Sequence, residues 1–474
     1  MKRLILCMLF FSTLLCACAV KPQSLLPENG KPPPLAERDP EDRPQDAATA
    51  APESESLPDP LTGALPAMNS AEFWITLDET ADVPRMTEEE RLAYRVLLCG
   101  TEGTGLVDLD RCADTITGEE IRRLILLYGE APAEGYFTGE AGDKPLRPEQ
   151  RQKIRENTAL EAIPDEAALQ YGFAAQSVIL RSYPSALPLY RTARDTRIDR
   201  GAETRVKLWS PLVLLHVSAD GEWVFAQAED YAGWLPAGAA ARCGREEWEG
   251  LRRRMEEDFV LVTAARLVTQ AGPTLYMAEK LPLEEEKEDG FTVLFPESEN
   301  GSLKLRRETL PKGDGLHRGY LPFTGRTLLE QVFRLLGESY GWGGTKDGWD
   351  CSALCQDCYL TAGVMLPRNS GAQAKIPGAQ TLEGLALEEK IRLLEQAGPG
   401  ALLTLPGHQT LYLGTYKGEA FVIHATMGVY APDGSGRYDP AEAVIVTSTL
   451  VRRDNSRTIL DNAHTAVPVA FPGP

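Results

Sequence analysis

The stretch WDCSALCQDCY, residues 349–359, places three cysteines at a C-x3-C-x2-C spacing. Asp350 is a typical helix N-cap and Gly363 a typical helix stop, so the pattern predicts a helix between them. Positions i, i+4 and i+7 of a helix project from one face. The three cysteines at these positions are Cys351, Cys355 and Cys358. Spacing alone therefore leaves three alternatives: an iron–sulphur cluster, a buried stripe, or one working thiol with two bystanders.

Position along the helix separates these alternatives. Only Cys351 lies in the first turn, where unpaired N–H groups and the helix dipole favour a thiolate. We therefore expect the pKa of this thiol to lie well below its reference value of about 8.5. Cys355 and Cys358 lie deeper, where cysteine behaves as a small apolar residue, and we expect them to pack. The spacing is also that of radical-SAM enzymes, but one continuous helix does not splay three sulphurs around a cluster.

A thiol nucleophile needs a base close by, oriented by a third group. Two histidines occur downstream on what are predicted to be successive strands, His408 in HQTLYL and His424 in AFVIHA. A turn is expected near residues 416–418. Both rings fall on one face of this hairpin if its turn has an odd length or a bulge intervenes, but not with a two-residue turn alone. The pattern therefore permits a site of Cys351, His408 and His424 without requiring it.

The chain opens with MKRLILCMLFFSTLLCACAV, a basic start and a short apolar run that ends in small residues. This is typical of a secretory signal and too short to span a membrane. Residues 15–18, LCAC, resemble the lipobox of bacterial lipoproteins, which implies a signal over 1–18 and a lipidated Cys18 as membrane anchor. Ala19 after the anchor favours the outer membrane by the same resemblance. We expect a periplasmic lipoprotein of the cell envelope, an unsuitable place for a radical-SAM cluster; an ordinary cleaved signal is the alternative.

Composition excludes several classes of protein. The net charge of −20 argues against a nucleic-acid partner and against electrostatic attachment to anionic lipid. Three of the nine cysteines belong to the signal, so the chain is not a disulfide scaffold. Cys99 and Cys112 are equally compatible with one bridge and with two buried thiols. The five histidines are scattered and no H-E-x-x-H motif occurs, so we predict neither a metal site nor a cofactor.

Pattern changes along the chain predict several domains. A Pro-, Ala- and acid-rich segment over 19–66 is expected to be a disordered linker. Residues 67–165 show helical periodicity, with helices predicted near 87–100, 117–127 and 148–157. Short alternating strands follow, and Y-A-G-W at 231–234 resembles the end of a bacterial SH3-like domain. The predicted limits are 166–243 for a first SH3-like barrel, 244–322 for a second and 323–474 for the last domain.

Four motifs in the last domain carry a further resemblance. They are YGWGGTKDGWDCS at 340–352, LPRNS at 366–370, GHQTLYLG at 407–414 and VIHA at 422–425. In this order they resemble the NlpC-type, papain-like cysteine peptidases of bacterial cell walls. The resemblance implies an α+β, multidomain fold, with a papain-like peptidase domain behind two small barrels and a mostly helical segment.

The resemblance also implies residue roles: Cys351 as nucleophile, His408 as general base and acid, and His424 as the group that orients His408. The implied substrate is the peptidoglycan stem peptide, cut between γ-D-glutamate and the diamino acid by a monomeric enzyme. Tyr340 is expected to help bind the oxyanion. The other residues predicted to bind substrate are Trp342, Asp350, Ser352, Asn369, Ser370, Glu203 and Tyr231.

Members with SH3-like barrels bind a free N-terminal L-Ala with a barrel acid, a barrel aromatic residue and an Asp after L-P-R. Glu203 is the predicted acid, with Asp199 as substitute, and Tyr231 the predicted aromatic. Asn369 replaces the Asp, which weakens a bond to an ammonium group because the charge is lost. The alternative function is a non-catalytic lipoprotein scaffold that binds cell wall through its barrels.

Overall fold

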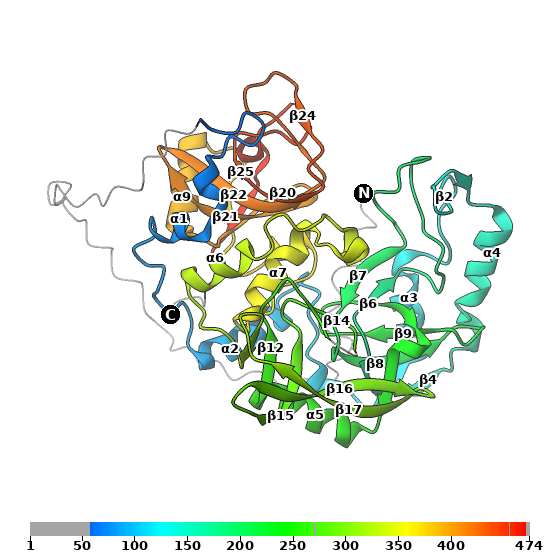
Figure 1. Cartoon of the computed structure of the whole chain (residues 1–474). Coiled ribbons are helices and arrows are strands. Elements are labelled where there is room, and N and C mark those ends of the chain that lie inside the picture. Colours follow the sequence, from blue (N-terminus) through cyan, green and yellow to red (C-terminus); the bar gives the residue numbers. More distant parts are fainter. Residues whose placement is uncertain (1–56, 270–271, 455, 471–474) are drawn as a thin grey trace, which may run out of the picture.

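The computed structural model describes residues 57–269, 272–454 and 456–470. The predicted signal, the Cys18 anchor and most of the predicted linker lie outside these residues. Figure 1 shows a C-terminal lobe, which carries β20 to β25, joined to a lobe of strands and short helices, the strand lobe, with α7 between them. Across the described ranges, no helix combines the length and the apolarity that a bilayer span needs.

The three predicted helices of the N-terminal segment are confirmed as α2 (Glu88–Gly100), α3 (Gly118–Ile125) and α4 (Pro148–Asn157). A short helix that was not predicted, α1 (Ala71–Ile75), precedes them. Thr87 caps α2 by accepting from the Glu90 N–H, while the Glu90 carboxylate accepts from the Thr87 N–H. Two small antiparallel pairs, which were not predicted, complete the segment: β1 (Thr115–Thr117) with β4 (Glu166–Ala168), and β2 (Phe137–Thr138) with β3 (Lys144–Pro145).

This segment packs against two different bodies, where the sequence suggested one domain. Trp74 of α1 is fully buried, and its ring centroid lies 5.5 Å from that of Phe421 in the C-terminal domain. Ile121 of α3 belongs instead to the core of the strand lobe. Helices of this length bury too little apolar surface to be stable alone, so each is stabilised by packing against the hydrophobic core of a neighbouring domain. Ala64, which was assigned to the linker, is also buried in the core of the C-terminal domain.

The strand lobe follows the predicted order of short strands. Its first set is β5 (Gln170–Ala174), β6 (Val178–Arg181), β7 (Ala202–Val206), β8 (Pro211–Val217), β9 (Trp223–Gln227), β10 (Ala232–Pro236) and β11 (Ala240–Cys243). An unpredicted helix follows, α5 (Arg245–Glu257). Its second set is β12 (Phe259–Val262), β13 (Arg266–Val268), β14 (Thr274–Tyr276), β15 (Lys280–Glu286), β16 (Gly290–Glu299), β17 (Ser302–Pro311) and β18 (Leu316–Arg318).

The two sets of strands are hydrogen-bonded to each other. Strand β11 pairs antiparallel with β5 of the first set and parallel with β17 of the second. The strands of both sets therefore form one continuous sheet that ends at β7. Its order is β18, β12, β15, β16, β17, β11, β5, β8, β9, β10, β6 and β7. This edge strand β7 lies against the Gly-rich loop of the C-terminal domain, so the strand lobe packs beside the predicted site.

The C-terminal domain is a six-stranded antiparallel sheet with helices packed on it. The sheet order is β19 (Gln380–Thr381), β26 (Thr465–Val467), β20 (Leu402–Leu405), β21 (His408–Tyr416), β22 (Glu419–Thr426) and β25 (Ala443–Ser448). A separate pair is β23 (Val429–Tyr430) with β24 (Tyr438–Asp439). The helices are α6 (Gly325–Phe333), α7 (Cys351–Thr361), α8 (Ser370–Gln373), α9 (Leu387–Ala397) and α10 (Ile459–Asn462).

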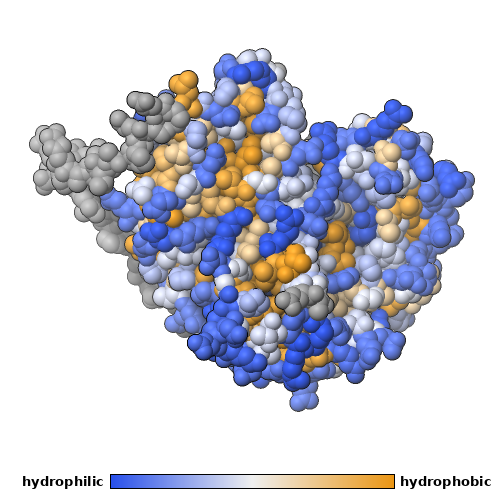
Figure 2. Space-filling model, in the orientation of Figure 1, coloured by the Kyte–Doolittle hydropathy of each residue, from blue (hydrophilic) through white to orange (hydrophobic). Residues whose placement is uncertain are grey.

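The predicted cysteine helix is confirmed as α7, with Asp350 as N-cap and Gly363 at φ 75° after its end. Cys355 and Cys358 are fully buried in the core between α7, α6 and the sheet. Cys99 packs at the border of that same core, whereas Cys112 lies in the core of the strand lobe. Figure 2 shows a mostly hydrophilic surface, hollowed between the lobe that carries β24 and the lobe that carries β2 and α4.

Candidate active site

Cys351 is the first residue of α7, and its neighbour Asp350 holds that helix start in place. The Asp350 carboxylate accepts hydrogen bonds from Ala353 N at 2.9 Å and from Gly343 N at 3.0 Å. Gly343 and Gly344 both have positive φ, and a Cβ at Gly343 would lie 2.9 Å from the Glu203 carbonyl oxygen of β7. Glycine is therefore required where this loop meets the strand lobe.

The expected low pKa of Cys351 is wrong for the described state. Burial and, second, the adjacent Asp350 carboxylate raise the pKa of this thiol to about 11. A hydrogen bond from the Gln409 backbone and the charge of Arg453 act in the opposite direction but do not compensate. The sequence argument counted the favourable helix N-terminus and omitted burial and the capping carboxylate. At rest the Cys351 side chain is therefore a neutral thiol.

A β-bulge places the two histidines on the same face of their hairpin. Strands β21 and β22 are joined by the two-residue turn Lys417–Gly418, both with positive φ, which by itself would separate the rings. The register shifts between Tyr412 and Gly414, and from there Leu411 pairs with Ile423. Because the extra residue changes the alternation by one, His408 and His424 project to the same side.

The two histidines form a buried hydrogen-bonded chain. His408 Nε2 lies 2.8 Å from His424 Nδ1, and His424 Nε2 lies 3.2 Å from Thr447 Oγ1 of β25. Because Nε2 of His408 is engaged, its Nδ1 is the ring atom left to accept a proton from a nucleophile. In that tautomer Nε2–H of His408 donates to His424, and Nε2–H of His424 donates to Thr447. The Cys351 thiol is hydrogen-bonded to the backbone of Gln409, the residue that follows His408 in β21.

Both imidazoles are neutral at rest. Burial lowers the pKa of His408 well below 6.5, and the charge of Arg453 and the neighbouring His424 lower it further. Burial, with Arg453, lowers the pKa of His424 to about 3. A neutral His408 is competent to accept a proton, so a neutral thiol beside a neutral imidazole suits general-base activation during attack.

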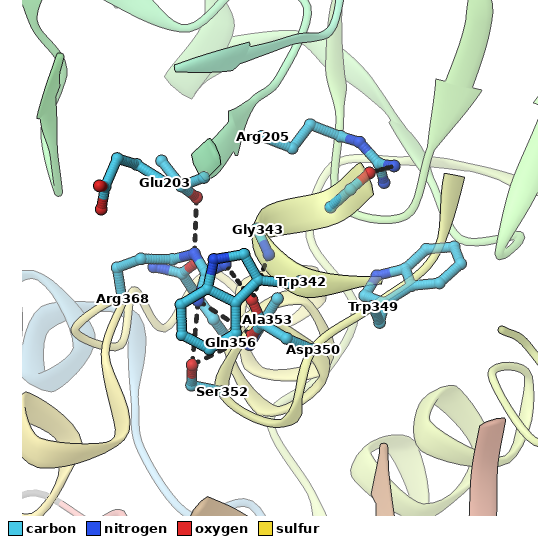
Figure 3. A network of polar contacts seen from close by, with 12 residues as sticks. Glu203, Arg205, Trp342, Gly343, Trp349, Asp350, Ser352, Ala353, Gln356 and Arg368 are labelled. Atoms are coloured by element: carbon cyan, nitrogen blue, oxygen red, sulfur yellow. Dashed lines mark hydrogen bonds and ion pairs between the residues drawn. The ribbon is translucent and has the colours of Figure 1, made fainter. Parts of the chain in front are cut away.

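A buried network ties the helix start to the strand lobe (Figure 3). Arg368 donates to both carboxylate oxygens of Asp350, at 2.6 and 3.1 Å, and to Ser352 Oγ at 2.9 Å. Its Nε donates to Thr204 Oγ1 of β7 at 2.6 Å. Burial alone would raise the pKa of Asp350, but Arg368 and the capping N–H groups hold it below its usual value. Asp350 and Ser352 were predicted to touch substrate, but both are buried and bonded here, so we assign them a positioning role.

Tyr340 and Trp342 lie on the loop that precedes α7. Burial raises the pKa of Tyr340, and the proximity of Cys351 raises it further, so its hydroxyl stays protonated beside the thiol. Trp342 donates from Nε1 to Ala202 O at 2.9 Å and stacks under Arg200 of the strand lobe. Tyr340 is therefore placed to donate to a reacting oxygen, while Trp342 joins the two lobes. The half-buried Ser370 begins α8, and its role stays a prediction.

The structure brings together the residues predicted to hold a free amine. Tyr231 Oη donates to Glu203 Oε2 at 2.6 Å, Ser182 Oγ donates to the other oxygen, and the Asn369 side chain hydrogen-bonds the Tyr231 hydroxyl. Burial raises the pKa of Glu203 although these hydroxyls lower it. Asp199, the substitute acid, is instead paired with Arg181 at 3.0 Å.

Sequence reasoning missed three residues of this region. Tyr128, from the helical segment, hydrogen-bonds Tyr231 and donates to Ala232 O at 3.2 Å, and nothing in its LLYG context signals this. Arg453 acts electrostatically on Cys351 and both histidines from a loop with no recognisable motif. Arg368 lies inside the motif LPRNS, so its importance was detectable there. The described residues contain no cluster of His, Cys, Asp and Glu able to hold a metal ion.

Comparison with known proteins places these parts in families. Residues 337–440 match the NlpC/P60 family and residues 188–236 match the SH3 domain of SH3b1 type. The chain is 25% identical over 216 residues to the gamma-D-glutamyl-L-lysine dipeptidyl-peptidase of Bacillus cereus, covering 42% of this chain and 61% of that protein. It is 31% identical over 102 residues to dipeptidyl-peptidase 6 of Lysinibacillus sphaericus, covering 21% and 32%. Each alignment thus spans less than two thirds of the relative.

One solved structure matches nearly the whole fold. An NlpC/P60 endopeptidase from Photobacterium damselae subsp. piscicida superposes with a TM-score of 0.69 over 88% of this chain and 100% of that chain, at 17% identity. At this identity the likeness concerns the fold. The chain is a multidomain protein in which an NlpC/P60 domain of papain-like fold follows an SH3 domain of the SH3b1 type.

Proposed function

We propose that the protein is a cysteine peptidase that hydrolyses the peptidoglycan stem peptide between γ-D-glutamate and the diamino acid. The observation that carries the proposal is the buried chain from Thr447 through His424 to His408, which ends beside a thiol at a helix start. A purely structural wall-binding scaffold would have no need for two neutral, hydrogen-bonded imidazoles in its core, since buried polar groups are costly. The activity named for the two relatives is of the same kind.

The proposed reaction follows from the tautomers. The Cys351 sulphur attacks the amide carbon while its proton passes to His408 Nδ1, and the carbonyl oxygen becomes an oxyanion. The Cys351 N–H at the start of α7 and the Tyr340 hydroxyl donate to that oxygen. The imidazolium of His408 then protonates the leaving amine, so the C–N bond breaks and a thioester remains. Water, deprotonated by His408, attacks the thioester and restores the thiol.

The substrate is proposed to have a free N-terminal L-Ala. Glu203 offers a carboxylate to an ammonium group, and the Tyr231 and Asn369 side chains flank it. An N-acylated stem peptide lacks the charge that this acid binds. Asn369 accepts through a neutral carbonyl, so it contributes less to this preference than an Asp would.

The proposed location is the cell envelope, on the periplasmic face of the outer membrane, through a lipid on Cys18. This rests on the N-terminal sequence alone, together with a net charge that disfavours electrostatic attachment to anionic lipid. A long Pro-rich, acidic tether would let the enzyme reach the wall as a monomer.

The test is mass spectrometry of the protein incubated with L-Ala-γ-D-Glu-diaminopimelate and with its N-acylated twin, with Cys351→Ala as control. Release of L-Ala-D-Glu from the free peptide alone would support both the peptidase and the amine preference. Equal cleavage of both peptides would keep the peptidase and remove the preference. No cleavage of either, with the protein folded and reduced, would favour the wall-binding scaffold.

A further inference from the structure

Arg453 is a cation beside the nucleophile that the proposed reaction does not use. It lies in the loop between β25 and α10 and is half-buried. Its Nη1 donates to Pro406 O at 3.3 Å, in the turn that leads into His408 at the start of β21. Its charge also acts on Cys351 and on Tyr340. Arg453 therefore borders the place where the scissile amide must lie.

The Arg453 guanidinium lacks an ion-pair partner among the residues that the structure describes. The adjacent Asp454 acts on it through charge alone. Asp454 directs its carboxylate to Ser456 N and Oγ, at 3.1 and 2.5 Å. A guanidinium has five N–H donors, and the Pro406 carbonyl takes one. A half-buried cation without an ion-pair partner is costly, and an anionic ligand removes that cost.

The position of Arg453 indicates which part of a peptide it meets. The amine-binding residues Glu203 and Tyr231 belong to the strand lobe and are hydrogen-bonded to each other. Arg453 lies instead in the loop after β25 of the peptidase domain, where it contacts the β20–β21 turn and acts through its charge on His408 and His424. A substrate whose amino end is held at the strand lobe passes Cys351 and continues toward the peptidase sheet. Its leaving portion is then the part that reaches the guanidinium.

We propose that Arg453 binds the side-chain carboxylate of the leaving diamino acid, and so makes the site selective for diaminopimelate over lysine. This inference rests on the proposed function and adds its specificity. The two diamino acids differ by one carboxylate at the end of an otherwise equal side chain, and a planar carboxylate matches the two parallel donors of a guanidinium. Lysine leaves Arg453 without that partner.

The experiment compares kcat/KM on two tetrapeptides, L-Ala-γ-D-Glu-X-D-Ala, with X as meso-diaminopimelate or L-lysine. The variants are Arg453→Gln, Arg453→Lys and the matched control Arg452→Gln, which removes the adjacent half-buried arginine. Because both peptides meet the same thiol and histidines, the ratio of the two kcat/KM values cancels changes in their chemistry. A third peptide carries D-isoglutamine in place of D-glutamate, which removes the carboxylate on the acyl side.

We expect the wild type to prefer diaminopimelate by about 10- to 100-fold, the range of one charge-assisted contact. Arg453→Gln should bring the ratio near one, Arg453→Lys should keep part of it, and Arg452→Gln should keep all of it. A wild-type ratio near one, or an unchanged ratio in Arg453→Gln, overturns the inference. Arg453→Gln could instead keep the diaminopimelate-to-lysine ratio and lose the preference for D-glutamate over D-isoglutamine. That result would place the Arg453 contact on the acyl side and would also overturn the inference. Cleavage of no peptide by the wild type would instead refute the proposed function.

Discussion

Replacing Arg368 with Met tests the buried network that joins the nucleophile helix to the strand lobe. Arg368 is 4% exposed and donates four hydrogen bonds, two of them to Asp350 and one across the lobes to Thr204. Met fills a similar volume but leaves the Asp350 carboxylate buried without its counter-charge. Breaking a buried pair in this way costs about 3–5 kcal/mol. For a domain of this size that corresponds to a fall in Tm of roughly 6–20 °C.

The chain offers a matched control in Arg326, which makes the same two-bond contact to Asp82 at 2.6 and 3.0 Å. There the side chains are 37% and 71% exposed, so solvent screens the pair and its loss should change the stability little. The assay is thermal unfolding followed by tryptophan fluorescence, because Trp342 and Trp349 flank the network. A fall in Tm for Arg368→Met no larger than that for Arg326→Met would refute the reasoning.

A second substitution separates lost packing from the uncompensated charge. In the Arg368→Met background, Asp350→Asn removes the buried charge, so the double variant should be more stable than the sum of the two single losses predicts. The pKa of Asp350 is held low in the folded state, so the contribution of its ionised form is present above the unfolded pKa and is lost as the pH falls through the folded pKa. The gap in Tm between wild type and Arg368→Met should therefore narrow in acid; a gap that widens would contradict the pairing.

The remaining predictions concern the site. His424→Ala should lower kcat by about 10³- to 10⁴-fold in a steady-state assay, because His408 loses the partner that fixes its tautomer. A loss of only about tenfold would contradict that role of His424. Since burial keeps the pKa of His408 well below 6.5, kcat/KM should fall only in more acidic solution, where the base is protonated, and a limb centred above pH 6.5 would contradict the neutral pair. Arg453→Gln should move that acid limb upward, because Arg453 lowers this pKa. Glu203→Gln should reduce the preference for a free over an acylated N-terminus in competition assays, and no change would remove Glu203 from the amine site. Cys355→Ala should cost about 1 kcal/mol of stability and no activity, since the thiol only packs; lost turnover would show otherwise.

Local sequence signals predicted the elements that carry the site. The Asp350 cap and the Gly363 stop fix α7, and Thr87 with Glu90 fixes the start of α2, because these side chains satisfy the free backbone groups of a helix end. The family motifs predicted a site that combines Cys351 with His408 and His424. Signals that act over a few residues are readable from the chain alone.

The pKa of the thiol could not be predicted in the same way. Its helix position argued for a low pKa, but desolvation and the Asp350 carboxylate dominate and raise it to about 11. Desolvation depends on every neighbour that covers the sulphur, and those neighbours come from strands far along the chain. The positions of Tyr128 and Arg453 at the site could not be predicted for the same reason, because they depend on tertiary structure and no local sequence pattern indicates them.

The sequence by itself determined that a thiol begins a capped helix and that two histidines lie on consecutive strands. Whether the histidines meet was decided by tertiary structure. The hairpin turn has two residues, which alone would direct the rings to opposite faces, and the bulge between Tyr412 and Gly414 reverses that outcome. A strand alternates its faces residue by residue, so one extra residue exchanges them, and only the packing of the whole sheet decides where that residue is accommodated.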